Sequence, residues 1–131
     1  MRRKREGDGA WNAVARGGPD AVSQAANSAI ELIDWTLRCR CDAADLEAWV
    51  ATQPKPPDYG DGNGRPTRQA KILYLLRGRD FEAAFVAATA QNLIALHREL
   101  QKLKHTNGEH DVDAVARLLP SVEAILLLLV E

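Results

Sequence analysis

The stretch "PDAVSQAANSAIELIDWTLR", residues 19–38, decides the fold class of this chain. Its apolar residues recur at intervals of three and four, which places them on one face of an α-helix. Pro19 suits the first turn of that helix, where a backbone N–H is not needed. We therefore expect a helix with one buried face. The stripe consists of Val22, Ala26, Ala29, Ile30, Ile33 and Leu37.

Helical patterns continue on both sides of this stretch. Asp42 and Asp80 are suitable N-caps for two of the helices, because their side-chain oxygens can accept from free backbone N–H groups. Pro120 is expected either to kink or to divide the last helix. The other predicted helices cover residues 10–16, 42–53, 67–78, 80–104 and 112–130. The expected buried face of the longest one is Phe81, Phe85, Ala88, Leu93, Leu96, Leu100 and Leu103.

The length and composition fit an all-α protein. The chain has 131 residues, enough for one domain, and only 5% are aromatic, which disfavours a sheet. We predict a bundle of four main helices plus short helical pieces, a single domain over residues 10–131. Residues 1–9, "MRRKREGDG", are expected to be a disordered basic tail, and residues 53–66, rich in proline and glycine, a long mobile loop.

Charge and motifs exclude several function classes. The formal net charge is −1, so a nucleic-acid site has to be a local patch. The common nucleotide, hydrolase and zinc-protease motifs are absent from the sequence, and we expect neither a cofactor nor a metal. Cys39 and Cys41 are expected to be reduced thiols. The basic start lacks a following apolar segment and "AILLLLV", 124–130, is too short to span a bilayer, so we expect a cytoplasmic protein without a membrane anchor.

The last predicted helix is apolar all round from Ile125 to Val130. A helix on the outside of a small bundle normally keeps one polar face. Either this end lies at the centre of the bundle or a partner covers its outer side. We expect a homodimer formed through the C-terminal helix.

A second stretch, "HRELQKLKHTNGEHD" at residues 97–111, carries the candidate chemistry. On a helix, Arg98 and His105 are separated by about 700° of rotation and so share one face, with Lys102 near the line between them. Arginine offers a fork of donors to phosphate, and histidine transfers protons near neutral pH. Cutting RNA without a metal needs these groups and a second proton-transfer group, which a symmetry-related copy can supply.

This pattern resembles the HEPN superfamily. Arg98 and His105 near the end of a long helix, followed by a glycine turn and an apolar helix, match its signature of arginine, four to six residues and histidine. The text "LQKLKHTNGEHDVDAVARLL", residues 100–119, is also similar to the abortive-infection and predicted PIWI-associated nuclease branches. The resemblance implies a dimeric helical bundle that acts as a metal-independent ribonuclease in prokaryotic defence or toxin systems, with Arg98 and His105 as catalytic residues.

Other polar residues are candidates for supporting roles. The accessory candidates are His110, Glu31, Asp34 and Lys102, and the phosphate-binding candidates are Arg65 and Arg68. Structural roles compete with each of these. His105 suits a helix C-terminus, where a cation stabilises the helix dipole, and His110 can belong to the next N-cap. Arg98 can instead pair with Glu31 or Asp34, and solvated faces explain the rest.

A second function is therefore kept beside the ribonuclease. The chain is also consistent with a non-catalytic helical module for dimerisation or interaction, the small subunit of a larger assembly. The ribonuclease implies an RNA substrate, and a defence or toxin role implies a larger protein partner or an antitoxin.

Overall fold

The computed structural model describes residues 2–18, 20–53, 66–105 and 112–130, with side chains from Asp8 onward. Within these ranges the chain forms six helices and no strand, which confirms the all-α prediction. The four long helices are α1 (Arg2–Arg16), α2 (Ala21–Arg40), α5 (Ala83–Lys104) and α6 (Val112–Val130), and the two short ones are α3 (Ala43–Ala51) and α4 (Arg68–Leu76). The first helix begins inside the segment predicted as a basic tail. The predicted loop over 53–66 lies almost wholly outside the described residues.

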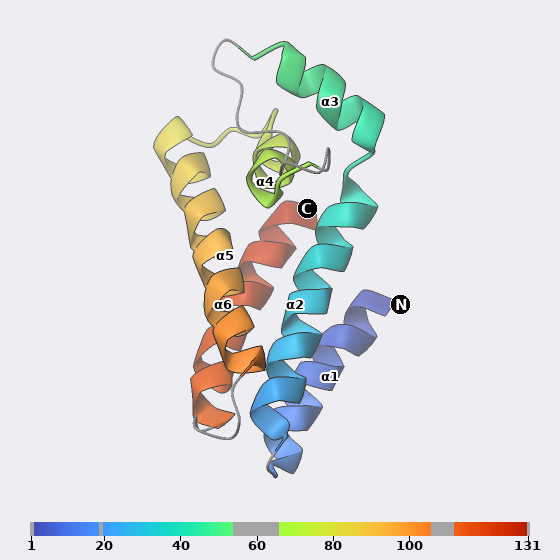
Figure 1. The fold of residues 1–131 in the computed structure, drawn as a ribbon. Coiled ribbons are helices and arrows are strands. Elements are labelled where there is room, and N and C mark those ends of the chain that lie inside the picture. The colour runs from blue at the N-terminus through green and yellow to red at the C-terminus, as the bar shows by residue number, and fades with distance from the viewer. Residues whose placement is uncertain (1, 19, 54–65, 106–111, 131) are drawn as a thin grey trace.

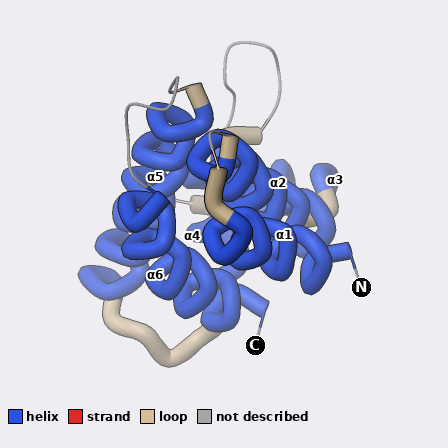
Figure 2. Tube along the Cα trace, turned by 90° about the horizontal axis from the view of Figure 1, so that it is seen from below, coloured by secondary structure: helices blue, strands red, loops and turns tan. Residues whose placement is uncertain are grey.

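The long helices form the body of the bundle, and the short ones close one end of it (Figure 1). In that view α2 lies between α5 and α1, with α6 behind, while α3 and α4 lie at the top. The view along the bundle in Figure 2 shows the same grouping, with α2 and α5 on one side and α6 on the other. The packing therefore leaves α5 with one side open to solvent beside α2 and α4.

Aliphatic side chains from five helices, α1, α2, α4, α5 and α6, meet in the main core. The predicted stripe on α2 is buried throughout, which confirms its assignment from periodicity. The largest fully buried side chains include Ile33, Leu37, Ile72, Leu76, Leu93, Leu100, Val115 and Val122. Alanines lie between α1 and α2, where small side chains let two backbones approach. A smaller cluster of Leu46, Val50, Ala70 and Tyr74 fastens α3 to α4.

Most helix ends follow the sequence, but the starts of α1 and α5 do not. The Asp42 carboxylate accepts from the backbone N–H groups of Ala44 and Asp45, at 3.0 and 3.1 Å, as expected of an N-cap. Thr67 caps α4 in the same way. The prediction that Asp80 caps the longest helix was wrong: α5 starts at Ala83 with Glu82 as N-cap, and the Glu82 side chain makes no capping hydrogen bond. Gly78, at φ 73°, makes the turn before it.

The predicted buried face of α5 is correct over its C-terminal two-thirds and wrong at its start. Leu93, Leu96, Leu100 and Leu103 are buried, but Phe85 is 46% exposed and Ala88 is exposed. The reason is that α3 and α4 cover less of α5 at this end than α2 and α6 cover further along. Phe85 instead lies against Phe81, with ring centroids 4.9 Å apart.

The last helix runs without a break through Pro120, so the proline does not divide it. Its apolar end is used in two ways. Ile125, Leu126 and Leu129 enter the core, whereas Leu127 points outward and is 57% exposed. The guanidinium of Arg79 donates to the carbonyl oxygens of Leu128 and Leu129, which satisfies acceptors left free at the helix end.

Candidate functional site

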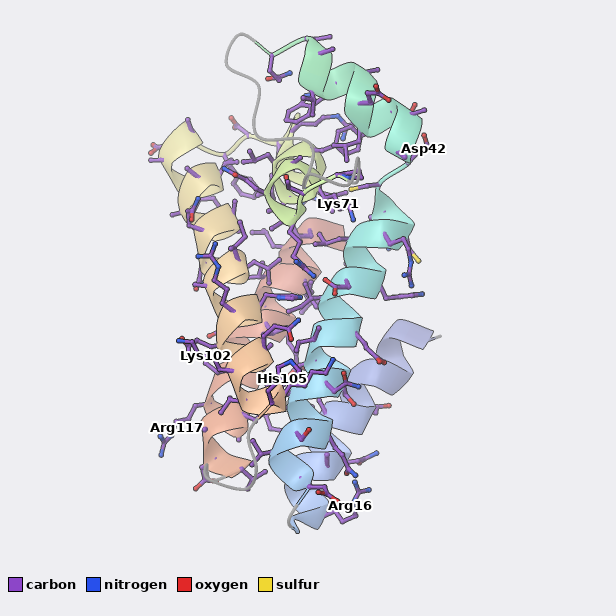
Figure 3. All side chains as sticks on the ribbon, in the orientation of Figure 1. Arg16, Asp42, Lys71, Lys102, His105 and Arg117 are labelled. Carbon is purple, nitrogen blue, oxygen red and sulfur yellow. The ribbon has the colours of Figure 1, made fainter. Side chains whose placement is uncertain are left out.

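Arg98 and His105 lie on one exposed face of α5. Seven residues separate them, or about 10 Å along the helix axis. Both side chains are exposed, and neither forms an ion pair with another described residue. Figure 3 shows His105 at the lower end of α5, on the side of the bundle where α2 also lies. The two residues are therefore free to meet a large ligand approaching this side.

His105 closes α5 through its backbone. Its N–H donates to the carbonyl oxygen of Gln101 at 3.3 Å, while the imidazole remains exposed. The capping role and the chemical role thus use different atoms of the same residue. A positively charged ring at this place is also favoured by the negative end of the helix dipole.

Glu99, the acidic neighbour of Arg98, forms an ion pair with Lys102. Glu99 would oppose phosphate binding at Arg98, but Lys102 Nζ lies 3.0 Å from its carboxylate. Both side chains are more than half exposed, so the pair contributes little to stability. Its effect is local: it offsets the negative charge on the face that holds Arg98. Lys102, predicted as an accessory residue, therefore acts on Glu99 in this structure.

A polar cluster joins three helices directly beside this face. Asp34 of α2 accepts two hydrogen bonds from Arg68 at the start of α4, from Nε to Oδ1 at 2.9 Å and from Nη2 to Oδ2 at 3.1 Å. His97 of α5 approaches the same carboxylate, with Nε2 3.2 Å from Oδ1. The imidazole is 6% exposed, whereas the Asp34 and Arg68 side chains are 38% and 44% exposed. The cluster is thus an ion pair at the surface with a buried histidine behind it.

The charge state of Asp34 follows from these partners. Burial by itself raises the pKa of the carboxyl group, but the hydrogen bonds from His97 and Arg68, together with their charges, outweigh it. The result is a pKa well below the usual range for aspartate. Asp34 therefore remains ionised over the whole physiological range and holds both donors in place.

His97 was missed as a site residue by the sequence analysis. Its position in the helical repeat could have indicated that His97 is buried. It follows Leu93 by four residues and precedes Leu100 by three, so it lies on the buried stripe of α5. A buried polar ring needs a hydrogen-bond partner. The sequence offered Asp34 as a carboxylate among apolar neighbours, but nothing in it joined the two across 63 positions.

The other predicted residues are placed as follows. Glu31 does not join Asp34; it accepts from Asn27 Nδ2 at 3.2 Å and is exposed. Asp34 pairs with Arg68, and no described contact joins Arg98 to Asp34 or Glu31, although one was considered. Arg65 and His110 lie outside the described residues. Arg68 is predicted to bind phosphate, and a phosphate there has to compete with Asp34.

The two cysteines were predicted to be reduced thiols. Cys39 and Cys41 are free thiols in the structure, and burial raises the pKa of Cys41 to about 11, although Lys71 and Arg77 oppose the shift.

The described part of the chain contains no group of three or more histidine, cysteine or acidic side chains able to hold a metal ion. Among the described helices, none is both long and apolar enough to cross a membrane.

The fold and the site together define a class of protein: an all-helical bundle that exposes an arginine and a histidine on one helix. A family model described as predicted pPIWI-associating nuclease matches residues 3–128. This match covers nearly the whole chain, which therefore belongs to that family. No curated protein and no solved structure matches the chain. The wider resemblance to the HEPN superfamily stays a prediction.

Proposed function

We propose that this chain is a metal-independent endoribonuclease of a prokaryotic defence system, with Arg98 and His105 as its catalytic residues. One observation carries the proposal: both side chains are exposed on a single face of α5, without an ion pair to any other described residue. Membership of a predicted nuclease family supports the reaction class. The description of that family also points to a protein partner of the pPIWI type.

The reaction that suits these groups uses the RNA as its own nucleophile. The neutral imidazole of His105 accepts the proton of a 2′-hydroxyl, and the 2′-oxygen attacks the adjacent phosphorus. The bond from phosphorus to the 5′-oxygen breaks, and that oxygen takes a proton from a second acid. Arg98 stabilises the charge that develops on the phosphoryl oxygens. The products are a 2′,3′-cyclic phosphate and a free 5′-hydroxyl.

The second acid is proposed to be His105 of another copy, so that the site lies in a cleft between two subunits. This requires the α5 faces of two copies to meet. The outer face of α6 is a separate surface. Leu127 is 57% exposed there, and Trp11 of α1, whose Nε1 donates to Glu123 of α6, is 38% exposed beside it. We propose self-association through this face as well.

These two surfaces lie on different sides of the bundle. His105 faces the viewer in Figure 3, on the side of α2, whereas α6 lies behind. Contact through α6 therefore leaves both His105 side chains open to solvent, and contact through α5 brings them together. The dimer through α6 and the shared cleft are thus independent proposals with independent tests.

The direct test is RNA cleavage by the purified chain in the presence of EDTA. We expect cleavage of single-stranded RNA and cyclic phosphate ends, and a loss of about 10²–10⁴-fold for His105→Ala, the usual contribution of general acid–base catalysis. Arg98→Ala should also impair cleavage, without unfolding the chain. Arg117→Ala, an exposed arginine on α6, is the matched control (Figure 3). A folded wild type that cuts no RNA would leave the interaction module as the function.

A further inference from the structure

A groove of about 550 Å³ opens at the end of the bundle where α3 and α4 meet the start of α5. Two aromatic rings, Trp49 and Phe81, line it together with aliphatic side chains from α4 and α5. Two amides, Gln53 and Gln69, supply donors and acceptors at its wall. A concave surface with aromatic and aliphatic walls and a few polar groups is able to receive a ligand that has flat apolar parts.

The charge of the groove is opposite to that of the chain. Arg77 and Arg79 line it, and no acidic residue is among its described lining residues, whereas the whole chain carries −1. Asp80 and Glu82 lie in the same connection but do not line the groove. The Arg77 guanidinium lies 3.6 Å from the centre of the Tyr74 ring and donates to the Tyr74 carbonyl oxygen, and this fixes it in position. The groove therefore attracts an anion that also has flat apolar parts.

One residue that lines the groove lies on the same face of α5 as the candidate catalytic pair. Ala87 lines it, and Ile94, Arg98 and His105 follow Ala87 at intervals of seven, four and seven residues. Such intervals return to the same face of a helix, so all four residues form one line along α5. The line is five turns long, about 27 Å from Ala87 to His105.

We propose that this groove binds unpaired bases of a single-stranded RNA whose backbone then runs along α5 to Arg98 and His105. Aromatic rings stack on any base, and the positive charges of Arg77 and Arg79 attract the phosphates between the bases while both guanidinium groups keep their bonds to backbone carbonyl oxygens. A duplex does not fit, because its bases are stacked inside and a groove of this volume cannot enclose it. The inference rests on the proposed ribonuclease function and adds a binding subsite to it: the RNA needs at least a short unpaired stretch on one side of the cut, where the groove holds its bases.

Binding of a non-cleavable RNA tests this inference apart from cleavage. The probe is a fluorescent 12-nucleotide 2′-O-methyl RNA, which lacks the attacking hydroxyl, and the readout is anisotropy with wild-type protein in EDTA. Ala87→Glu puts a negative charge into the groove, and Ala88→Glu makes the same change one residue further, at an exposed position that does not line the groove. We expect Ala87→Glu to weaken binding about tenfold or more, the loss of roughly one stacked base, and Ala88→Glu to stay within about twofold.

Equal dissociation constants for the two variants, or no RNA binding by the wild type, would overturn the inference. Gln69→Glu keeps the side-chain size and places a charge on the opposite wall, so it replaces Ala87→Glu if that variant does not fold. A double-stranded RNA of the same sequence should displace the probe poorly, and displacement as good as by the single strand also counts against the proposal. Binding that depends on Ala87 without any cleavage would contradict only the ribonuclease assignment.

Discussion

The buried imidazole of His97 is held by the carboxylate of Asp34, 63 positions earlier in the chain, at 3.2 Å. Arg68 completes the contact from a third helix at 2.9 Å. The cluster fixes α2, α4 and α5 relative to one another. Because Arg98 follows His97 directly, fixing the inward-facing ring also sets the rotation of α5 that turns Arg98 outward.

Removing the carboxylate should destabilise the fold. Asp34→Ala leaves the buried His97 ring without its described acceptor, and an unsatisfied buried polar group costs about 1–3 kcal/mol. We expect the melting temperature to fall by a few degrees for each kcal/mol. Glu31→Ala, three residues away on the same helix but exposed, is the control and should change stability by about 0.5 kcal/mol or less. Equal melting temperatures for the two variants would show that the cluster is not structural.

The same cluster predicts a dependence of stability on acid. Because the folded pKa of Asp34 is depressed below its ordinary value of 3.8, its contribution is fully present above that value and is lost as the pH falls. We expect the difference in unfolding free energy between wild type and Asp34→Asn to be largest near neutral pH and to shrink below about pH 4. Because Asp34 and Arg68 are both partly exposed, solvent screening keeps this pH-dependent change in unfolding free energy near 1 kcal/mol or less. Urea titrations at pH 7 and pH 3 measure it, and a constant difference contradicts the argument.

A shared active site predicts that one altered copy inactivates the dimer. If the cleft uses His105 of one copy as the base and His105 of the other as the acid, a mixed dimer of wild type with His105→Ala keeps only one of the two groups. Random exchange between equal amounts leaves a quarter of the dimers wild type, against half before exchange, so RNA cleavage should fall about twofold. Cleavage is measured before and after the subunits exchange. Unchanged activity after exchange means that each site lies within a single copy.

The exposed leucine of α6 predicts a surface for self-association. Leu127→Glu places a charge on the outer face without entering the core, since the buried residues of this turn are Ile125, Leu126 and Leu129. We expect sedimentation to show a smaller assembly for Leu127→Glu than for the wild type, with unchanged circular dichroism. Ala48→Glu, an exposed position on α3, is the control for the added charge. A wild type that sediments as a monomer at high micromolar concentration contradicts the proposal.

The two cysteines should differ in reactivity. Cys39 is exposed, whereas Cys41 is partly buried with a pKa raised to about 11, so little reactive thiolate forms there at pH 8. We expect iodoacetamide to label one thiol quickly, and Cys39→Ser to remove that fast phase. Mass spectrometry of the labelled peptides identifies the site. Equal labelling rates at both positions would show that Cys41 is more open than its burial indicates.

The helical architecture could be predicted because its signals are local. The stripe on α2, the cap at Asp42 and the turn at Gly78 each depend on residues a few positions apart, and all are present in the structure. The face shared by Arg98 and His105 follows in the same way from the helical repeat. Local signals failed at Phe85, whose burial depends on how far other helices extend along α5.

The residues that contact one another across the bundle were decided only by tertiary structure. Asp34, Arg68 and His97 each had a plausible local role, but their meeting depends on how three helices pack, and no periodicity encodes a contact across 63 positions. The groove beside α4 likewise exists because α3, α4 and α5 leave a space that their sequences do not show. Sequence by itself determined the helices and the outward face of α5, since hydrogen bonding and apolar spacing act within a few turns. The packing of the helices decided which polar side chains of α5 contact another helix, as His97 does, and which remain exposed, as Arg98 and His105 do.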